Sequence, residues 1–240
     1  SNPNLKAEEL SEAINNANIL IVRSTKVFAE TIEAGKSLEL IIRAGAGVNN
    51  IDLEKASSSG VYVANCPGKN SDAVAELALG HIIACDRRIV DASLDLRSGN
   101  WKKKAYQNAA GLKGRTLGII GLGSIGRALA KLAKGLNMRV IAWSRSLTPD
   151  KADKLDLVYC ESIDEVAANA DVISVHLAVT PDTKHLLNTK FFNKMKDEAI
   201  FVNTSRGEIV DTAALHKAID EKTLRVGLDV FENEPGSGLA

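Results

Sequence analysis

The 240-residue sequence predicts an α/β protein built on parallel β-sheets. Short runs of β-branched and apolar residues alternate with helical patterns almost throughout, and this alternation occurs in two series. Strands buried on both faces of a parallel sheet have such continuous apolar sequences, with helices between them. A glycine-rich turn also follows the first strand of the second series. We therefore expect two domains with a cleft between them.

The first series predicts a small domain over residues 1–68. A helix is expected at residues 6–15, followed by three short strands, at residues 19–22, 38–42 and 61–64. The strands at residues 19–22 and 61–64 are uninterrupted apolar runs and the one at residues 38–42 contains a single charged residue, Glu39, which indicates burial in a sheet.

The second series predicts a larger domain over residues 69–234. It opens with a long helix at residues 70–88, for which Ser71 is the expected N-cap. Residues 97–110 are polar and contain three consecutive lysines, so we expect a solvated loop or arm there. Strands are then expected at residues 116–120, 139–143, 172–176, 199–203 and 226–230. The two clearest helices between them are expected at residues 127–134 and 212–220.

The composition argues against several classes of partner. Thirty basic residues balance thirty acidic ones, which gives no reason to expect nucleic acid or a membrane surface as a partner. Three cysteines stand far apart without C-x-x-C spacing, so neither a disulfide framework nor a zinc or other metal site is expected. No signal-peptide pattern or membrane-length apolar run is present, and we expect a cytoplasmic protein.

The glycine-rich turn has the spacing G-x-G-x-x-G at residues 121–126, between a predicted strand and a predicted helix. This context predicts a Rossmann-type, doubly wound dinucleotide-binding domain. Gly121 allows the tight turn, Gly123 lets the backbone approach a pyrophosphate, and Gly126 lets helix and strand pack closely. The N–H groups at the start of the helix, those of Ser124 and Ile125 included, can bind the anion. The alternative is a glycine-rich turn without a ligand.

The end of the second strand of this domain bears on the choice between NAD and NADP. NAD enzymes usually carry an acidic residue there for the ribose 2′-hydroxyl. This sequence has Ser144 with Arg145 beside it, and an arginine can bind a 2′-phosphate through two hydrogen bonds. NADP is therefore expected to be accepted and to be slightly favoured. Alternatively, Arg145 is a solvated residue or stacks on the adenine, and NAD is used.

Two polar turns follow later strands and place charged residues at strand ends. Arg206 follows the strand at residues 199–203, and Glu234 lies in an acidic turn after the strand at residues 226–230. Ligands of open α/β sheets bind beyond the carboxyl ends of the strands, so Glu234 and Arg206 are expected to lie near each other. From these residues alone, a surface ion pair remains an equal alternative to a catalytic role.

Four segments together resemble the D-isomer-specific 2-hydroxyacid dehydrogenases. They are residues 121–126, residues 203–211 (Asn-Thr-Ser-Arg-Gly-Glu-Ile-Val-Asp), residues 229–235 (Asp-Val-Phe-Glu-Asn-Glu-Pro), and Val-His at 175–176 with Thr-Pro-Asp-Thr at 180–183. The resemblance implies hydride transfer between a nicotinamide cofactor and a small 2-hydroxy or 2-keto acid. It also implies a smaller, flavodoxin-like substrate domain beside the dinucleotide domain.

The resemblance implies roles for individual residues. Arg206 would hold the substrate carboxylate, and Glu234 would be the partner of a catalytic histidine. Asp229 would lie by the nicotinamide carboxamide, and His176 and Thr204 would line the cofactor site. The family's histidine lies after the Glu-Pro turn, whereas no histidine follows His216 here. We therefore expect the sequence to be incomplete at both ends, with residues 235–240 starting a return to the first domain.

Within the family, the first domain most resembles the phosphoglycerate dehydrogenases. Arg23 follows one predicted strand, and a second arginine opens a glycine-containing loop after another; these residues and their neighbours form the expected substrate site: Arg23, Arg43, Ala44, Gly45 and Gly47. Two arginines suit a phosphate dianion. Alternatively, both arginines pair with acidic neighbours. The implied reaction is oxidation of 3-phosphoglycerate to 3-phosphohydroxypyruvate in serine synthesis.

Two other functions stay open at this point. One is a glyoxylate or hydroxypyruvate reductase, which a preference for NADP would favour. The other is a dinucleotide-sensing interaction protein with the same fold, similar to the corepressor relatives, because a fold alone does not fix a function. The long helix and the arm around Trp101 resemble the family's dimer surface, so a homodimer is expected.

Overall fold

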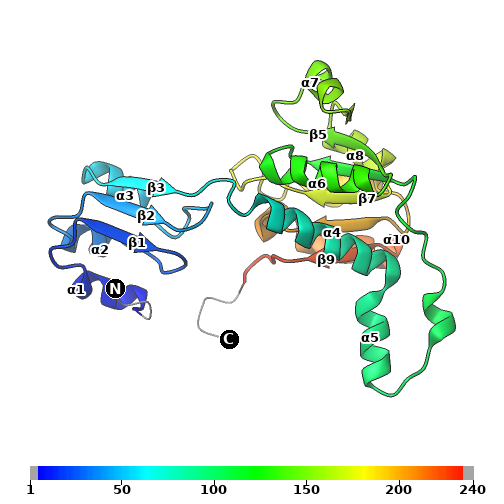
Figure 1. The fold of residues 1–240 in the computed structure, drawn as a ribbon, viewed down its shortest axis with the longest axis horizontal. Helices are drawn as coiled ribbons and strands as arrows, with labels where there is room; N and C mark the ends of the chain where they lie inside the picture. Colours follow the sequence, from blue (N-terminus) through cyan, green and yellow to red (C-terminus); the bar gives the residue numbers. More distant parts are fainter. Residues whose placement is uncertain (1–4, 235–240) are drawn as a thin grey trace. The chain divides into compact units, whose positions relative to one another are not determined.

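The computed structural model describes residues 5–234, and the expected return to the first domain at residues 235–240 lies outside them (Figure 1). The chain divides into two compact units, Ser1–Asn70 and Ser71–Ala240. Each unit has its own parallel sheet, with one hydrophobic core in the first unit and two in the second, and each unit is described here by itself.

The first unit is a three-stranded parallel sheet with the order β1-β2-β3. Its elements are η1 (Ala7–Glu9), α1 (Leu10–Ala13), β1 (Ile19–Val22), α2 (Ala29–Ala34), β2 (Leu40–Arg43), α3 (Leu53–Ser58) and β3 (Tyr62–Asn65). The helices bury Leu10, Ile32 and Ala56 against the inward side chains of the strands, including Ile41. The expected cover on both faces is absent among the described residues, because the outward side chains of β1 remain exposed.

The second unit contains a six-stranded parallel sheet with the order β6-β5-β4-β7-β8-β9. Its strands are β4 (Thr116–Ile120), β5 (Arg139–Trp143), β6 (Val158–Tyr159), β7 (Val172–Val175), β8 (Ile200–Asn203) and β9 (Arg225–Leu228). The chain moves outward from β4 to β6, returns to the other side of β4, and moves outward again from β7 to β9. This is the predicted doubly wound order, and it places the switch point between β4 and β7.

Helices cover both faces of this sheet. Alternate side chains of β4 explain the two layers: Leu117 and Ile119 face one core, whereas Ile120 faces the other. The first face is covered by α4 (Ser71–Arg87) and α6 (Ser124–Gly135), which pack against each other (Figure 1). The second face is covered by α8 (Ile163–Asn169), α9 (Thr189–Lys194) and α10 (Thr212–Lys222). The carboxyl ends of all six strands therefore lie at one edge, with helices on either side.

Several short helices begin at capping side chains. Thr148 caps α7 (Pro149–Lys154), and Ser162, Asn188 and Asp211 cap α8, α9 and α10 in the same way. Each cap binds one of the free N–H groups of the first helical turn. The predicted cap of α4 is wrong: Ser71 is itself the first helical residue, and its buried hydroxyl has no hydrogen-bond partner among residues 5–234.

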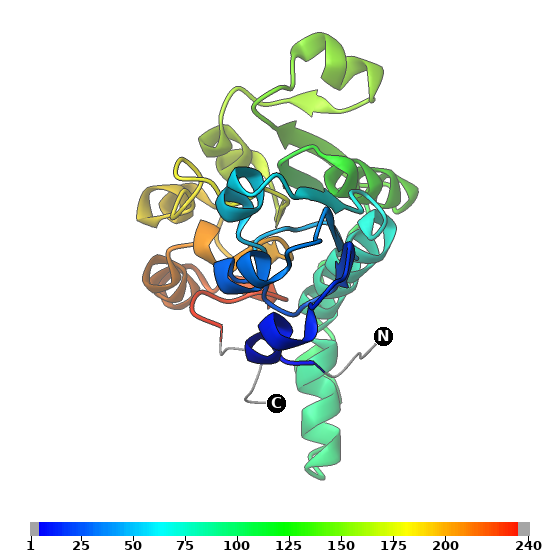
Figure 2. The same ribbon diagram turned by 90° about the vertical axis from the view of Figure 1, so that its left-hand side faces the viewer.

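An arm leaves the sheet between α4 and β4. It consists of α5 (Ile89–Arg97) and η2 (Lys103–Tyr106), and α5 projects away from the other elements of its unit (Figure 1 and Figure 2). Asp86, which is 2% exposed, accepts hydrogen bonds from the Gly111 N–H and from Arg115. Because Asp86 lies near the end of α4 and Gly111 precedes β4, one carboxylate joins the two ends of the arm.

The strands β1, β4 and β5 have the predicted bounds, and the other predicted strands differ from the observed ones by one or two residues at one or both ends. The helix predicted at residues 70–88 is confirmed as Ser71–Arg87, and the solvated arm is confirmed as well. His216 is exposed on α10. Within residues 5–234, none of the helices has the length and hydropathy that a bilayer-spanning segment needs. The same residues contain no group of His, Cys, Asp or Glu side chains arranged to hold a metal ion.

Candidate active site

The glycine-rich turn joins β4 to α6 at the switch point of the second sheet. Gly121 has φ +99°, and a Cβ atom there would lie 2.4 Å from the carbonyl oxygen of His176. A Cβ on Gly126 would lie 2.3 Å from the carbonyl oxygen of Gly121, so strand and helix approach closely there. Gly123 differs, because a Cβ on it would meet no atom within 4 Å. Two glycines thus close the turn, while Gly123 leaves open space in front of it.

The start of α6 can bind an anion. Gly123 occupies the N-cap position, and no side chain caps the helix. Ser124 is exposed and Ile125 is half-buried, so the first N–H groups of the helix are free for a ligand. The positive end of the helix dipole adds to this preference for negative charge. The turn therefore fits the pyrophosphate of a dinucleotide.

Two buried polar atoms that have no hydrogen-bond partner among the described residues lie at the carboxyl ends of the neighbouring strands. They are Nδ1 of His176, directly after β7, and Oγ1 of Thr204, directly after β8. Buried polar atoms are normally hydrogen-bonded, and exceptions mark functional sites or places for a ligand. Both residues lie at the sheet edge that carries the glycine turn, so they fit the remaining part of a dinucleotide.

His176 is neutral near pH 7. Burial lowers the pKa of its imidazole to about 4 from an ordinary 6.5. Its Nε2 lies 3.0 Å from the hydroxyl oxygen of the buried Ser174, which fixes the ring. His176 thus offers a ligand a neutral hydrogen-bonding group and no positive charge.

The low pKa of His176 makes stability depend on pH. The unfolded chain binds a proton at this histidine below about pH 6.5 and the folded chain only near pH 4, so stability falls as the pH drops from about 6.5 to 4. The loss is about 3 kcal/mol at most, because one pKa unit corresponds to about 1.4 kcal/mol. In urea unfolding across this range, His176→Asn should lose less stability than the wild type. Equal slopes for the variant and the wild type would contradict the assignment.

The end of β5 carries the residues that bear on the choice of cofactor. Ser144 is half-buried directly after the strand, and Arg145 is exposed beside it. No described residue forms an ion pair with Arg145. Its guanidinium is therefore available to a ligand at the same sheet edge as the glycine turn.

The loop that carries Arg206 is held by Asn203, the last residue of β8. The buried Asn203 amide donates to the carbonyl oxygen of Arg206 at 2.9 Å, and its Oδ1 accepts from the N–H and the hydroxyl of Ser205 at 3.0 and 2.7 Å. The Arg206 side chain is exposed, and its Nη1 donates to the carbonyl oxygen of Ser205 at 2.7 Å. The backbone is thus rigidly held, while the guanidinium is left without an anionic partner among residues 5–234.

The acidic turn after β9 lies beside this loop. The Asp229 N–H donates to the carbonyl oxygen of Asn203 at 3.1 Å, and the Asp229 side chain is exposed. Glu234 does not bond to Arg206, contrary to the ion pair considered from the sequence, because its Oε1 accepts instead from the Phe231 N–H at 2.9 Å. No histidine within residues 5–234 is hydrogen-bonded to Glu234.

A contact that the sequence analysis missed joins this turn to two other loops. Glu232 binds His185 Nε2 through Oε1 at 2.6 Å and the Thr212 hydroxyl through Oε2 at 2.8 Å. The pKa of the Glu232 carboxyl is held below its ordinary value, mainly by the hydrogen bond with His185. No periodic pattern in the sequence predicts the His185–Glu232 pair, whose members are 47 residues apart. The role of Asn203 had a sequence signal, because asparagine at the end of a strand often forms side-chain hydrogen bonds with the backbone of the following turn.

These residues of the second unit are the ones that decide the family. Residues 79–238 match the family described as "D-isomer specific 2-hydroxyacid dehydrogenase, NAD binding domain". The chain is 43% identical over 233 residues to a hydroxypyruvate reductase of Thermotoga maritima, covering 96% of this chain and 74% of that protein. The chain belongs to the D-isomer-specific 2-hydroxyacid dehydrogenase family.

Two further relatives show the breadth of this dehydrogenase family. A D-3-phosphoglycerate dehydrogenase of Methanocaldococcus jannaschii is 40% identical over 233 residues, and the alignment spans 96% of this chain but 44% of that protein. The crystal structure of a putative D-isomer-specific 2-hydroxyacid dehydrogenase from Polaromonas sp. has a TM-score of 0.87 and 30% identity, with coverage of 97% of this chain and 74% of that one. These likenesses confirm the predicted family and fold.

The first unit of this dehydrogenase-family chain has its own polar edge. β2 ends at Arg43, whose guanidinium lies against Gly45: a Cβ there would be 1.6 Å from Nη1. Nε of Arg43 is buried and has no hydrogen-bond partner in the part of the chain that the structure describes, and Ala44 and Gly47 lie in the loop that follows. Arg23 follows the neighbouring strand β1 and is exposed. Neither arginine pairs with an acidic residue within the described residues, so the alternative of structural ion pairs is wrong there.

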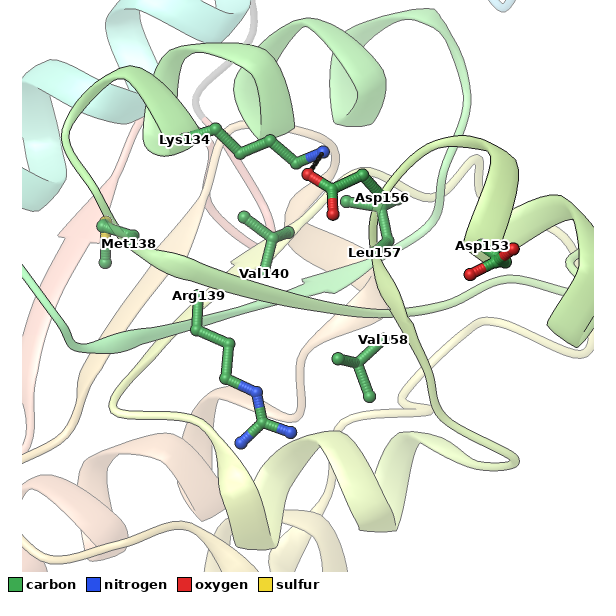
Figure 3. A pocket seen from close by; sticks show the side chains of 8 residues that line it. All are labelled: Lys134, Met138, Arg139, Val140, Asp153, Asp156, Leu157 and Val158. Atoms are coloured by element: carbon green, nitrogen blue, oxygen red, sulfur yellow. Dashed lines mark hydrogen bonds and ion pairs between the residues drawn. The ribbon is translucent and has the colours of Figure 1, made fainter.

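Two pockets lie outside the candidate site. One, of about 250 Å³, lies at the amino end of β5, where Lys134 pairs with Asp156 and Arg139 extends along its wall (Figure 3). The other, of about 550 Å³, lies between α4 and β9 and includes Cys85, whose thiol pKa is raised to about 11 by burial. A thiol with this pKa is protonated near neutral pH and unreactive. Neither pocket includes the glycine turn or Arg206.

Proposed function

We propose that the full-length protein transfers a hydride between a nicotinamide cofactor and a small 2-hydroxy or 2-keto acid. The observation that carries this proposal is the exposed guanidinium of Arg206, which has no anionic partner among residues 5–234 and lies on a loop fixed by Asn203. Its loop follows β8, and the glycine turn follows β4, so both lie at one edge of the sheet.

Each residue has a defined task in the proposed reaction. The cofactor, when bound, supplies or accepts the hydride at its nicotinamide ring. The glycine turn and the start of α6 bind the pyrophosphate, and His176, Thr204 and Asp229 line the nicotinamide side. Arg206 binds the substrate carboxylate and draws electron density from the keto oxygen, which stabilises the charge that develops there. Glu234 is proposed to orient the base that takes the hydroxyl proton.

We propose 3-phosphoglycerate as the first candidate substrate. The support lies in the first unit, where Arg23 and Arg43 have no acidic partner among the described residues and Arg43 keeps a buried Nε unpaired. The loop that follows Arg43 is closed by the Asn65 amide, which donates to the carbonyl oxygen of Ala46 at 2.7 Å. Two arginines and a glycine loop suit a dianionic phosphate.

A hydroxypyruvate or glyoxylate reductase is the second candidate. It is favoured by the 43% identity to the Thermotoga maritima hydroxypyruvate reductase and by Arg145, which suits a 2′-phosphate. NAD binding fits the matched domain, and we propose that NADP is also accepted. Steady-state kinetics with both cofactors test this proposal, and a preference for NAD above about tenfold would contradict a role for Arg145.

Arg23→Gln distinguishes the two substrates. In the full-length protein, it should raise KM for 3-phosphoglycerate by about tenfold or more, because a charged hydrogen bond is lost. It should leave KM for glyoxylate unchanged, since glyoxylate has no phosphate. An equal effect on both substrates would favour the reductase. Dinucleotide binding without turnover of any of these acids would favour an interaction protein related to the corepressors.

We also propose that the protein forms a homodimer through α4 and the arm. None of the residues of α5 is buried, and Leu94, Leu96 and Trp101 are exposed in or beside it. Cation–π contact of Arg88 with the Tyr106 ring and hydrogen bonds of Asp95 with Tyr106 and Lys102 brace the arm. A braced arm with exposed apolar side chains suits a protein contact.

A further inference from the structure

Three loops of the second unit meet at the carboxylate of Glu232. The first loop joins β7 to α9 and contains His185. The second carries Arg206 and leads through η3 (Gly207–Ile209) to Thr212 at the start of α10, and the third contains Glu232 itself, after β9. Because Oε1 binds His185 and Oε2 binds Thr212, a single side chain fixes the third loop to both of the others.

The backbone of the third loop packs directly on the residue after Arg206. A Cβ atom on Gly207 would lie 2.1 Å from the carbonyl carbon of Phe231 and 2.4 Å from the Glu232 nitrogen. At this distance any movement of the Glu232 backbone must displace Gly207 or open a gap beside it. The position of the Glu232 backbone therefore limits where Gly207, and with it the adjacent Arg206 backbone, can lie.

The loop containing His185 closes the contact from the other side. The His185 N–H donates to the carbonyl oxygen of Glu208 at 2.9 Å, so its backbone holds η3 while its ring holds Glu232. His185 has φ +50°, a conformation that costs energy for a residue with a Cβ and persists only where contacts hold it. His185, Glu232, Gly207 and Glu208 thus form a closed ring of contacts around the base of Arg206.

We propose that His185 and Glu232 are positioning residues that aim the Arg206 guanidinium at the substrate carboxylate. This inference rests on the proposed function, because it assigns the pair a role only through Arg206. Neither side chain is expected to touch cofactor or substrate. A misplaced guanidinium loses part of its charged hydrogen bonding to the substrate carboxylate, which corresponds to about tenfold in affinity, so the pair matters although it is partly exposed.

The test compares His185→Ala and Glu232→Ala with the wild type in the full-length protein. Each variant should raise KM for the preferred 2-keto acid by about tenfold and change kcat by less than about threefold. The dissociation constant of NADH should stay within about twofold of the wild-type value. The double variant should be no worse than Glu232→Ala, which already loses the contact with His185 together with the one to Thr212. His185→Gln retains an N–H donor toward Glu232 and should recover most of the KM.

The chain offers a matched control in the ion pair between Lys194 and Asp164. Its side chains are 43% and 25% exposed, compared with 44% and 22% for His185 and Glu232, and it joins α9 to α8. Lys194→Ala should leave KM unchanged. An unchanged KM in His185→Ala would overturn the proposal. A loss of NADH affinity that parallels the rise in KM would also overturn it, since that indicates a general structural defect.

A binding measurement separates failure of this inference from failure of the proposed function. Oxalate is an unreactive dianion similar in size to glyoxylate. Calorimetry with oxalate therefore measures carboxylate binding to the protein–NADH complex without turnover. Wild-type protein that neither reduces a 2-keto acid nor binds oxalate would overturn both. Wild-type protein that does both, with His185→Ala binding oxalate equally well, would overturn the positioning role alone.

Discussion

Gly123→Ala should weaken dinucleotide binding by about tenfold or more, which is about 1.4 kcal/mol, without lowering stability. A Cβ at this position would contact no protein atom within 4 Å, and φ of −75° suits alanine. The added methyl group would occupy the space in which a pyrophosphate approaches the start of α6. Fluorescence titration with NADH measures the affinity, and urea unfolding measures the stability.

Gly135→Ala provides the control for this substitution. Gly135 lies in the last turn of the same helix, and a Cβ there also meets no atom within 4 Å. Alanine should stabilise the helix there by about 0.5–1 kcal/mol and leave NADH affinity unchanged. An unchanged affinity in Gly123→Ala would mean that the turn does not hold the pyrophosphate.

Arg206→Gln should lower kcat/KM for 2-keto acids by about 100- to 1,000-fold, because it removes the charge that holds the carboxylate and stabilises the developing oxyanion. The Arg206 backbone is held by Asn203, so the loop should keep its shape. The dissociation constant of NADH should therefore stay near the wild-type value, and both quantities are measured on the same preparations.

Arg139→Gln is the matched control for charge. Arg139 is also an exposed arginine without an ion-pair partner among residues 5–234, but it begins β5 at the opposite edge of the sheet (Figure 3). It should retain full activity. If Arg206→Gln kept more than about a tenth of the wild-type kcat/KM, the carboxylate would have to be bound elsewhere.

Much of the second unit follows from local sequence. The strands β4 and β5 have the predicted bounds because each has a polar first residue, an apolar interior and a turn signal after it. By contrast, β6 has two residues, too few for any periodic signal, and α5 buries none of its side chains. The start of α7 has a sequence signal, since Thr148 is the N-cap and Pro149 occupies the first helical position.

The candidate site was predictable only in part, because motifs specify which residues occur but not which of them bond. The glycine turn and the loop of Arg206 are local features, and the sequence identified both. The bonds of Glu232 depend on how three loops meet in space, whereas Glu234 bonds within its own turn and not, as the sequence had suggested, to Arg206. Such pairings come from tertiary packing and have no signature in a single sequence.

Asp86 makes the arm a separable insertion. Its carboxylate, near the end of α4, accepts hydrogen bonds from the Gly111 N–H and from Arg115. Arg115 also donates to the carbonyl oxygen of Asp171, and Arg225 donates to the carbonyl oxygen of Asp86. The two ends of the arm are therefore held together at Asp86, and residues 88–110 form an insertion between α4 and β4. An insertion held in this way can change in length and sequence, and so in the protein surface that it contacts, without moving the strand ends that carry the candidate site.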